Sequence, residues 1–306
     1  MSLTISIVTP SLNQGNFLAE TIQSVLCQIS DQVEYLVIDA GSTDNSLDLL
    51  RRNFSSLKWV SEPDRGQADA INKGFRMARG DILGWLNADD LLCPGALQEV
   101  AHQFTEDQHL MLLYGNAHHV DEHGHFLEAY PSADFQLERF SYQCFICQPA
   151  CFFRRSLLEA AGFLDPELHF ALDLDLWIRF GKLKPQHPEW KFKHIPQVLA
   201  LSRMHTRNKT LFKRNEALRE IVTVVRRHFR FVPFNWIYAL EETAGGCYDG
   251  FFQRSPFRIS LLVKSISKWI WINRSRSGLI VRDFCRRLRS PLHSYKSLRG
   301  RTGERL

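Results

Sequence analysis

The stretch that decides the fold reads Asp81-Ile-Leu-Gly-Trp-Leu-Asn-Ala-Asp-Asp90, an apolar run that ends in two adjacent carboxylates. The run predicts a buried strand that delivers both acids to one edge of a sheet. Two like charges side by side repel, and in a dry setting one of them protonates unless a cation compensates the pair. Carboxylate and amide oxygens suit Mg²⁺ or Mn²⁺, so the stretch indicates either a metal site or a solvated acidic turn.

Short apolar runs alternate with helical patterns over the first hundred residues, which predicts an α/β fold with a parallel sheet. The expected strands span 5–9, 33–39, 57–60, 82–86, 110–114 and 150–154, the expected helices span 18–26, 68–78 and 156–162, and 191–204 is expected as paired strands broken at Pro196. Asp39, Asp89 and Asp90 then fall at carboxyl ends of strands. In open α/β sheets, ligands bind at that edge.

Charge is distributed unevenly along the 306 residues, which are 44% hydrophobic and carry a formal net charge of +5. Residues 251–306 hold 14 lysines and arginines against two acids, Asp283 and Glu304. This composition predicts a globular body with one sizeable core, residues 1–225, and a basic helical extension, residues 226–306.

The extension repeats apolar residues at helical intervals among lysines and arginines, with Trp269 and Trp271 in the same stretch. Its apolar runs are shorter than the roughly 18 to 20 residues that span a bilayer. Basic, aromatic, amphipathic helices are typical of segments that lie in an anionic membrane interface. The alternative is a pair of helices that pack on the body with a solvated basic face. The tryptophans and the apolar stripe favour lipid over nucleic acid.

The N-terminus enters an alternating strand pattern without a basic segment followed by a long apolar one, so we expect no secretory signal. Among seven cysteines, Cys144, Cys147 and Cys151 cluster. No fourth ligand stands at a zinc-site spacing, so the pattern favours buried reduced thiols in a cytoplasmic protein.

Five motifs follow one another between residues 3 and 210. They are Thr9-Pro-Ser-Leu-Asn13, Val37-Ile-Asp-Ala-Gly-Ser-Thr-Asp44, Ser61-Glu-Pro-Asp-Arg-Gly-Gln-Ala-Asp-Ala-Ile-Asn-Lys-Gly74, Leu86-Asn-Ala-Asp-Asp90 and Leu172-Asp-Leu-Asp-Leu-Trp177. In this order the motifs closely resemble glycosyltransferase family 2. The resemblance implies the nucleotide-diphospho-sugar transferase (GT-A) fold, in which helices flank a mixed, mainly parallel sheet. It also implies an inverting transfer from a nucleotide-diphospho-sugar, UDP-linked, to a glycan or lipid-linked acceptor in cell-surface polysaccharide assembly.

The resemblance also implies a donor site. Its expected members are Thr9, Pro10, Ser11, Asp39, Arg65, Asp69, Asn72 and Asp89. Asp39 would accept the imide N–H of uracil, with capping of the following turn as the alternative. Asp69 and Asn72 lie three residues apart and share a helix face, and Arg65 would meet a phosphate.

A divalent ion, Mg²⁺ or Mn²⁺, is the cofactor that the resemblance implies, with Asp89, Asp90 and His205 as its ligands. It would bridge the diphosphate and stabilise it as a leaving group. Asn87 stands where the family usually has an acid, so Asp89 and Asp90 carry the charge. His205 is either a ligand or an ordinary surface or core histidine. Its basic neighbours, among them Arg203, favour an anion-binding loop.

Asp173 is the expected catalytic base, because inverting transfer needs one carboxylate opposite the leaving group to take the acceptor's proton. It matches the acid of the family's Glu-Asp motif, in which Leu172 here replaces the glutamate. Asp175 is the rival, although helical geometry turns it by about 200° from Asp173.

Two other functions stay open. A nucleotidyltransferase on the same fold would carry a glycine-rich, basic loop after the first strand, and residues 9–15 lack one. A catalytically degenerate, membrane-associated protein that binds nucleotide-sugars would account for Asn87 and Leu172. We expect a cytoplasmic protein, peripheral at the inner face of the plasma membrane, whose partners are the donor, the acceptor and anionic lipid but not nucleic acid.

Overall fold

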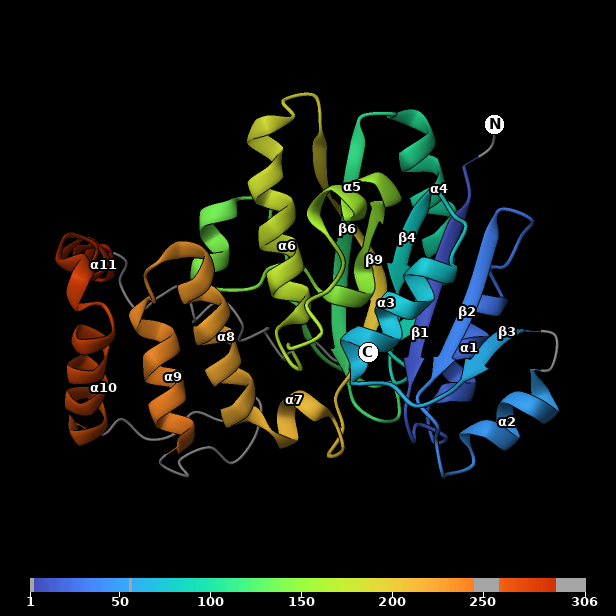
Figure 1. Ribbon diagram of the computed structural model, residues 1–306, viewed down its shortest axis with the longest axis horizontal. Coiled ribbons are helices and arrows are strands. Elements are labelled where there is room, and N and C mark those ends of the chain that lie inside the picture. Colours follow the sequence, from blue (N-terminus) through green and yellow to red (C-terminus); the bar gives the residue numbers. More distant parts are fainter. Residues whose placement is uncertain (1–2, 55–56, 245–258, 290–306) are drawn as a thin grey trace, which may run out of the picture. The chain divides into compact units, whose positions relative to one another are not determined.

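The computed structural model describes residues 3–54, 57–244 and 259–289 (Figure 1). The chain forms two compact units, residues 1–224 and 225–306. Each unit has its own packing, and the first contains the sheet.

The first unit is built on a nine-stranded sheet in the described residues, with strand order β3-β2-β1-β4-β8-β6-β9-β5 and β7 paired to β6. The strands are β1 (Ile5–Ser11), β2 (Val33–Asp39), β3 (Lys58–Ser61), β4 (Ile82–Trp85), β5 (Leu91–Leu92), β6 (Leu110–Val120), β7 (Phe126–Ala129), β8 (Cys151–Arg154) and β9 (Lys191–Arg203). β1 to β4 pair in parallel, as do β6 and β9, while β8 is antiparallel to both of its neighbours. The predicted α/β fold with a mixed sheet is confirmed.

Helices cover the sheet, and Figure 1 shows α3 and α6 on the face turned toward the viewer. The helices of this unit are α1 (Leu18–Leu26), α2 (Ser46–Asn53), α3 (Gln67–Met77), α4 (Ala96–Glu106), α5 (Arg155–Ala161), α6 (Leu172–Leu183), α7 (Lys209–Phe212) and α8 (Arg214–Phe229, which continues into the second unit). Short 3₁₀ turns lie at η1 (Leu137–Ser141), η2 (Gln148–Ala150) and η3 (Lys184–Gln186). The α1 and α3 predictions agree with these bounds within one residue.

An aromatic cluster seats α6 on the sheet. Its members come from α3, β4, β8 and α6 and are Phe75, Trp85, Phe153, Trp177 and Phe180. Their ring centroids lie 5.2 to 6.3 Å apart, with Trp85 stacked on Trp177. All five side chains are buried. Because aromatic rings bury large areas with specific geometry, this cluster fixes where the α6 side chains lie.

The expectation of paired strands within residues 191–204 is wrong. The segment is one strand, β9, which runs beside β6 through a register shift: Ile195 pairs with Gly115, and Val198 with Asn116. Proline has no N–H to give to a ladder, so Pro196 falls in the bulge. Its carbonyl accepts a hydrogen bond from Asn116 Nδ2 at 2.8 Å, so the chain continues past the proline without a turn. The two short strands β5 and β7 were not predicted.

The second unit contains α9 (Phe234–Ala244), α10 (Ile259–Ile272), the 3₁₀ turn η4 (Arg274–Arg276) and α11 (Ser277–Arg289). The indole N–H of Trp269 and the amide of Asn273 both donate to the carbonyl of Val232, at 2.9 and 3.0 Å. Lys264 and Lys268 both pair with the buried Glu241. Throughout the described part of the chain, every helix is too short or too polar to cross a membrane.

We predict that Phe153→Ala lowers the free energy of unfolding of the first unit by about 3 to 5 kcal/mol, because it opens a cavity among fully buried rings. Urea unfolding followed by tryptophan fluorescence measures the change. The control is Phe126→Ala, whose ring is 61% exposed and whose loss changes stability by about 0.5 kcal/mol or less. Equal shifts in the two variants would contradict the proposed role of the cluster.

Candidate active site

Asp39 is the last residue of β2, and its carboxylate closes the turn that follows. Oδ2 accepts hydrogen bonds from the backbone N–H of Gly41 at 3.0 Å, the backbone N–H of Ser42 at 2.9 Å and the hydroxyl of Ser61 at 2.7 Å. Oδ1 accepts one from the Ser42 hydroxyl. The side chain is fully buried. Turn capping, the alternative reading of Asp39, is therefore present in the structure, and contact with a base is left to Oδ1.

The loop after β1 is tied to the same turn. Asn13 adopts a left-handed φ of 54°, and its Oδ1 accepts hydrogen bonds from the backbone N–H groups of Thr43 and Asp44, at 2.8 and 3.3 Å. The backbone N–H of Gly15 donates to Asp44 Oδ2 at 2.9 Å. The two loops that end β1 and β2 therefore form one hydrogen-bonded surface at the carboxyl edge of the sheet.

The expected donor residues at the end of β1 are buried. Thr9 forms a hydrogen bond with the hydroxyl of Tyr35 at 3.0 Å and supports β2. Pro10 is buried, and Ser11 is a buried hydroxyl that has no partner within the described residues. Of these three residues, Ser11 therefore keeps a polar atom for a ligand.

The start of α3 carries the next expected donor residues. Asp69 Oδ2 accepts a hydrogen bond from the backbone N–H of Arg65 at 3.2 Å, and this bond is the main reason that the pKa of Asp69 lies below its usual range. The guanidinium of Arg65 lies 3.6 Å from Asp69 and is 79% exposed, so a phosphate can reach it. Asn72, in contrast, is buried. Its Nδ2 donates a hydrogen bond to the carbonyl of Leu164 at 2.8 Å, and its Oδ1 accepts one from the backbone N–H of Leu164 at 3.0 Å. In the structure, Asn72 therefore ties α3 to the segment of Leu164, and its contact with the donor stays a prediction.

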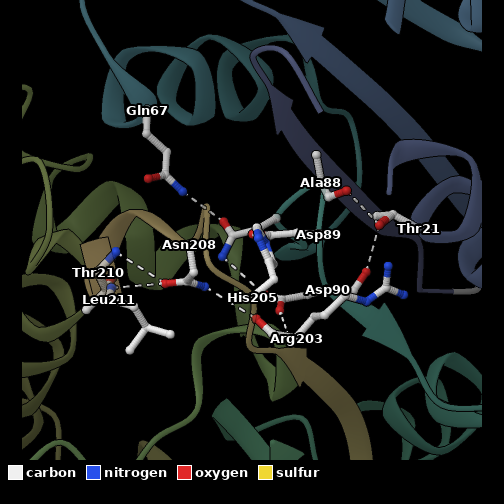
Figure 2. Close-up of polar contacts among 11 residues, drawn as sticks. Thr21, Gln67, Ala88, Asp89, Asp90, Arg203, His205, Asn208, Thr210 and Leu211 are labelled. Carbon is white, nitrogen blue, oxygen red and sulfur yellow. Dashed lines mark hydrogen bonds and ion pairs between the residues drawn. The ribbon is translucent and has the colours of Figure 1, made fainter. Parts of the chain in front are cut away.

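Hydrogen bonds hold the carboxylate of Asp90 at both of its oxygens (Figure 2). Oδ1 accepts from the backbone N–H of Arg203 at 2.9 Å, and Oδ2 accepts from Asn87 Nδ2 at 3.1 Å. Gln67 Nε2 orients Asn87 by donating to its Oδ1 at 2.9 Å. Burial, together with the charge of Asp89, raises the pKa of Asp90 far above its ordinary value. Both carboxylate oxygens therefore serve the protein itself.

Asp89 instead meets His205, whose Nε2 lies 3.1 Å from Asp89 Oδ2 (Figure 2). The imidazole is almost fully buried against the ring of Phe17, with centroids 4.4 Å apart. Asn208 shapes this loop by donating to the carbonyl of Arg203 at 3.3 Å while its Oδ1 caps α7. His205 is therefore a buried histidine fixed by Asp89 and Phe17, and not a surface histidine.

Arg203 corrects one expectation. Its guanidinium is not part of an open anion-binding loop: it is buried, lies 4.9 Å from the ring of Phe17 and pairs with Glu20 at 2.7 Å. Glu20 and Gln67, which hold Arg203 and Asn87, were not predicted either. Their partners lie far along the chain, so spacing carries no signal for them.

The side-chain oxygen and nitrogen atoms at this edge suit a divalent ion that is also bound by a phosphate. Within the described residues, no group of three or more His, Cys, Asp or Glu side chains is assembled around one point. Asp89 and His205 nevertheless supply an oxygen and a nitrogen 3.1 Å apart, and Mg²⁺ commonly takes one or two carboxylates and completes its shell with water and substrate phosphates. Burial, and after it the charge of Asp89, raises the pKa of Asp90, and a cation beside Asp89 would offset the second of these causes.

Asp173 lies in the first turn of α6 and is partly buried. Burial raises the pKa of its carboxyl to about 6, and the charge of Glu220 adds to the effect. The rival Asp175 is buried and pairs with Arg179 at 2.8 Å, and Arg179 also donates to the carbonyls of residues 161–163. Asp175 therefore holds α6 in place, and Asp173 stays the predicted base.

Cys144, Cys147 and Cys151 are free thiols in the structure. Cys147 and Cys151 are buried and Cys144 is partly buried. Burial raises the pKa of all three thiols. They are therefore neutral near pH 7, as expected for structural thiols.

The chain is similar to known proteins in sequence and in fold. The family model described as Glycosyl transferase family 2 matches residues 6–162. The chain is 23% identical over 232 residues to chondroitin synthase of Escherichia coli, an alignment that covers 74% of this chain and 32% of that relative. The chain spans between 22% and 54% of the length of the first curated relatives that it matches.

Solved structures share the fold. S. aureus TarS in complex with UDP-GlcNAc superposes with a TM-score of 0.57 and 15% identity, over 88% of this chain and 81% of that one. The mannosyltransferase PcManGT from Pyrobaculum calidifontis, in complex with GDP-Man and Mn²⁺, gives a TM-score of 0.58 and 16% identity, over 97% of this chain and 84% of that one. At these identities, the likeness establishes the GT-A architecture.

We predict that Asn87→Asp destabilises the metal-free protein by about 1 to 3 kcal/mol, because it replaces a hydrogen-bond donor to Asp90 with a third carboxylate. Mn²⁺ is expected to restore stability, so the rise in Tm on adding Mn²⁺ exceeds that of the wild type. Thermal unfolding with EDTA and with Mn²⁺ measures both effects. Asn45→Asp, at the exposed N-cap of α2, is the control. A metal-free Tm equal to that of the wild type would contradict the proposed role of the Asn87 amide.

Proposed function

The chain belongs to glycosyl transferase family 2, and we propose that this glycosyltransferase moves a sugar, with inversion, from a UDP-linked donor to a glycan or lipid-linked acceptor in cell-surface polysaccharide assembly. The observation that carries the proposal is the pairing of Asp89 with His205 beside the buried Asp90, at the carboxyl edge of β4. The relation to a bacterial chondroitin synthase supports the choice of pathway class.

Donor binding uses the loops that end β1, β2 and β3. Asp39 presents Oδ1 to the base, Ser11 offers its unpaired hydroxyl, and the exposed guanidinium of Arg65 meets the diphosphate. Asp69 holds the Arg65 segment through the backbone bond described above. The base is thereby recognised by a turn whose shape is already set by hydrogen bonds, which lowers the ordering cost of binding.

Asp89 and His205 would hold a divalent ion, Mg²⁺ or Mn²⁺, which when bound neutralises the diphosphate as it leaves. Asp90 supports the metal position indirectly, because its hydrogen bonds with Asn87 and Arg203 fix the turn that carries Asp89. Thr21 pins the same turn, with its hydroxyl 2.9 Å from the carbonyls of both Ala88 and Asp90. Asp90 is therefore proposed as a supporting acid more than as a ligand.

Asp173 acts as the base. The acceptor hydroxyl gives its proton to the Asp173 carboxylate while its oxygen bonds to the anomeric carbon and the bond from that carbon to the diphosphate oxygen breaks. A base must be deprotonated, and with a pKa of about 6 Asp173 is mostly ionised at pH 7. Transfer is therefore expected to fall as the pH is lowered through about 6.

A second candidate function is nucleotide-sugar binding without turnover. The observation that favours it is Asn87, whose amide serves Asp90 where the family usually has an acid. A nucleotidyltransferase has no such support, because the loop of residues 9–15 has no basic side chain for a triphosphate.

We predict that Asp89→Asn and Asp173→Asn each lower kcat for transfer by about 10² to 10⁴-fold, since each removes a group that acts on the reacting atoms. Assays with Mn²⁺ and a panel of UDP-sugars measure the loss, and NMR of the product reads the anomeric configuration. Asp48→Asn, an exposed position on α2, is the control. Full transfer activity in either site variant would overturn the mechanism, while tight UDP binding without turnover in the wild type would favour the second candidate.

We also propose that residues 226–306 bind an anionic membrane surface, as a peripheral contact at the inner face of the plasma membrane. One face of α10 exposes Ile259, Val263, Ile266 and Ile270, a spacing that places them in one stripe. Trp271 is exposed beside them with the guanidinium of Arg274 5.4 Å from its ring. The excess of lysine and arginine in residues 251–306 complements anionic lipid.

We predict that the double variant Val263→Glu/Ile270→Glu reduces binding to vesicles of phosphatidylglycerol and phosphatidylcholine by about tenfold or more, because two charges enter the apolar stripe. Cosedimentation measures the partition. Phe212→Glu changes an exposed ring outside the stripe and is expected to leave partition unchanged. Binding that is equal on purely neutral vesicles, or unaffected by the double variant, would contradict the proposal.

A further inference from the structure

Three consecutive backbone N–H groups, those of His169, Phe170 and Ala171, donate to a single carboxylate, that of Glu220 on α8. Phe170 and Ala171 donate to Oε1 at 2.6 and 2.7 Å, and His169 lies 3.0 Å from each carboxylate oxygen. Successive amides of this kind form a concave anion-binding surface. Here the anion comes from the chain itself, from a residue about fifty positions further along.

This surface is the beginning of α6. Ala171 is the N-cap of α6 and has no side-chain oxygen with which to cap it. The first N–H groups of a helix have no partners within it, and the helix dipole favours a negative charge at that end. Glu220 therefore supplies from α8 the cap that the local sequence does not provide.

Asp173 follows two residues after this cap. The body of α6 is fixed by the aromatic cluster around Trp177 and by the pairing of Asp175 with Arg179. Those contacts lie after Asp173 in the helix, whereas the segment before Asp173 donates three backbone N–H groups to Glu220 and buries Leu168 and Ala171. A carboxylate in the first turn shifts in position if that segment frays.

We propose that Glu220 is a positioning residue for sugar transfer, which fixes the start of α6 so that the carboxylate of Asp173 faces the reacting carbon. The inference rests on the proposed function, in which Asp173 is the base. Glu220 acts through Asp173 and does not touch substrate. It also links the base to the segment of His205, because α8 follows that segment along the chain after the short helix α7.

The charge of Glu220 has a separate effect. The titratable groups that face Asp173 are Glu220, Tyr130 and the thiols of Cys144, Cys147 and Cys151. Burial raises the pKa of Tyr130 and of all three thiols, so these four groups are neutral near pH 6. Lys209, which lies over the ring of Phe170, is the cation near Glu220. The negative charge of Glu220 therefore contributes to the raised pKa of Asp173.

Two substitutions separate position from charge. Glu220→Gln keeps an oxygen that accepts the amide hydrogen bonds but removes the charge. We expect its kcat at pH 8 to stay within about threefold of the wild type, and the acid limb of its pH profile to move to lower pH, because Asp173 loses a like charge. Glu220→Ala removes both, and we expect kcat to fall by about tenfold or more while the KM for the donor changes by less than about twofold.

The measurements are kcat and KM between pH 5 and 8.5 on the full chain, with circular dichroism to verify folding. Glu216→Gln, an exposed position one turn earlier on α8, is the control and is expected to match the wild type. A folded Glu220→Ala with wild-type kcat, or an unshifted acid limb in Glu220→Gln, would overturn the inference. If Glu220→Ala does not fold, Glu220→Asp takes its place, because it keeps the charge but draws the carboxylate back from the three amides; wild-type kcat in that variant would overturn the inference. Asp173→Asn in the same series keeps the two proposals apart, because full transfer by that variant would reject the base itself.

Discussion

The structure depends on how two adjacent carboxylates are accommodated at the end of β4. Asp89 and Asp90 cannot both stay ionised in a dry setting without compensation, and the fold treats them differently. Asp90 is buried and takes hydrogen bonds from Asn87 and from the backbone of Arg203, whereas Asp89 faces His205. Asp90 stabilises the turn. Asp89 is left at the surface of the site, where a cation shared with a diphosphate would complete the charge balance.

In the proposed mechanism, this turn and the base Asp173 act on the same substrate, and the surrounding elements fix each of them. The parallel strands β1 to β4 bring their carboxyl ends to one edge, so the turns at Asp39 and Asp89 belong to the same surface. The aromatic cluster packs α6 against β4 and β8, because Phe153 of β8 contacts both Trp85 of β4 and Trp177 of α6. Burial raises the pKa of Asp173 in α6 to about 6. In the proposed mechanism, Asp89 and Asp173 have different tasks because their surroundings differ, which is a general way for a protein to assign roles to carboxylates.

The sequence was sufficient for the sheet edge and the family, because both are written in local patterns. Apolar runs that end in acids placed Asp39 and Asp89 correctly, and the family model confirmed the resemblance. The prediction failed where a partner lies far along the chain. Periodicity gives the face of a helix but not what packs against it. The pairing of Asn72 with Leu164 and the hydrogen bonds that residues 169–171 donate to Glu220 therefore could not be foreseen. Pro196 misled the strand assignment because a bulge absorbs a missing N–H without ending the strand.

The central claim is that the edge formed by Asp89 and His205 binds a divalent ion together with the donor's diphosphate. Electron paramagnetic resonance of Mn²⁺ tests it most directly, since the free aqueous ion gives a signal that is lost on binding. The account predicts that UDP and the protein together remove the free Mn²⁺ signal far more than either does alone, and that this cooperativity disappears in His205→Ala. If UDP binds with the same affinity in EDTA as in Mn²⁺, and the free Mn²⁺ signal persists in the ternary mixture, the account is contradicted.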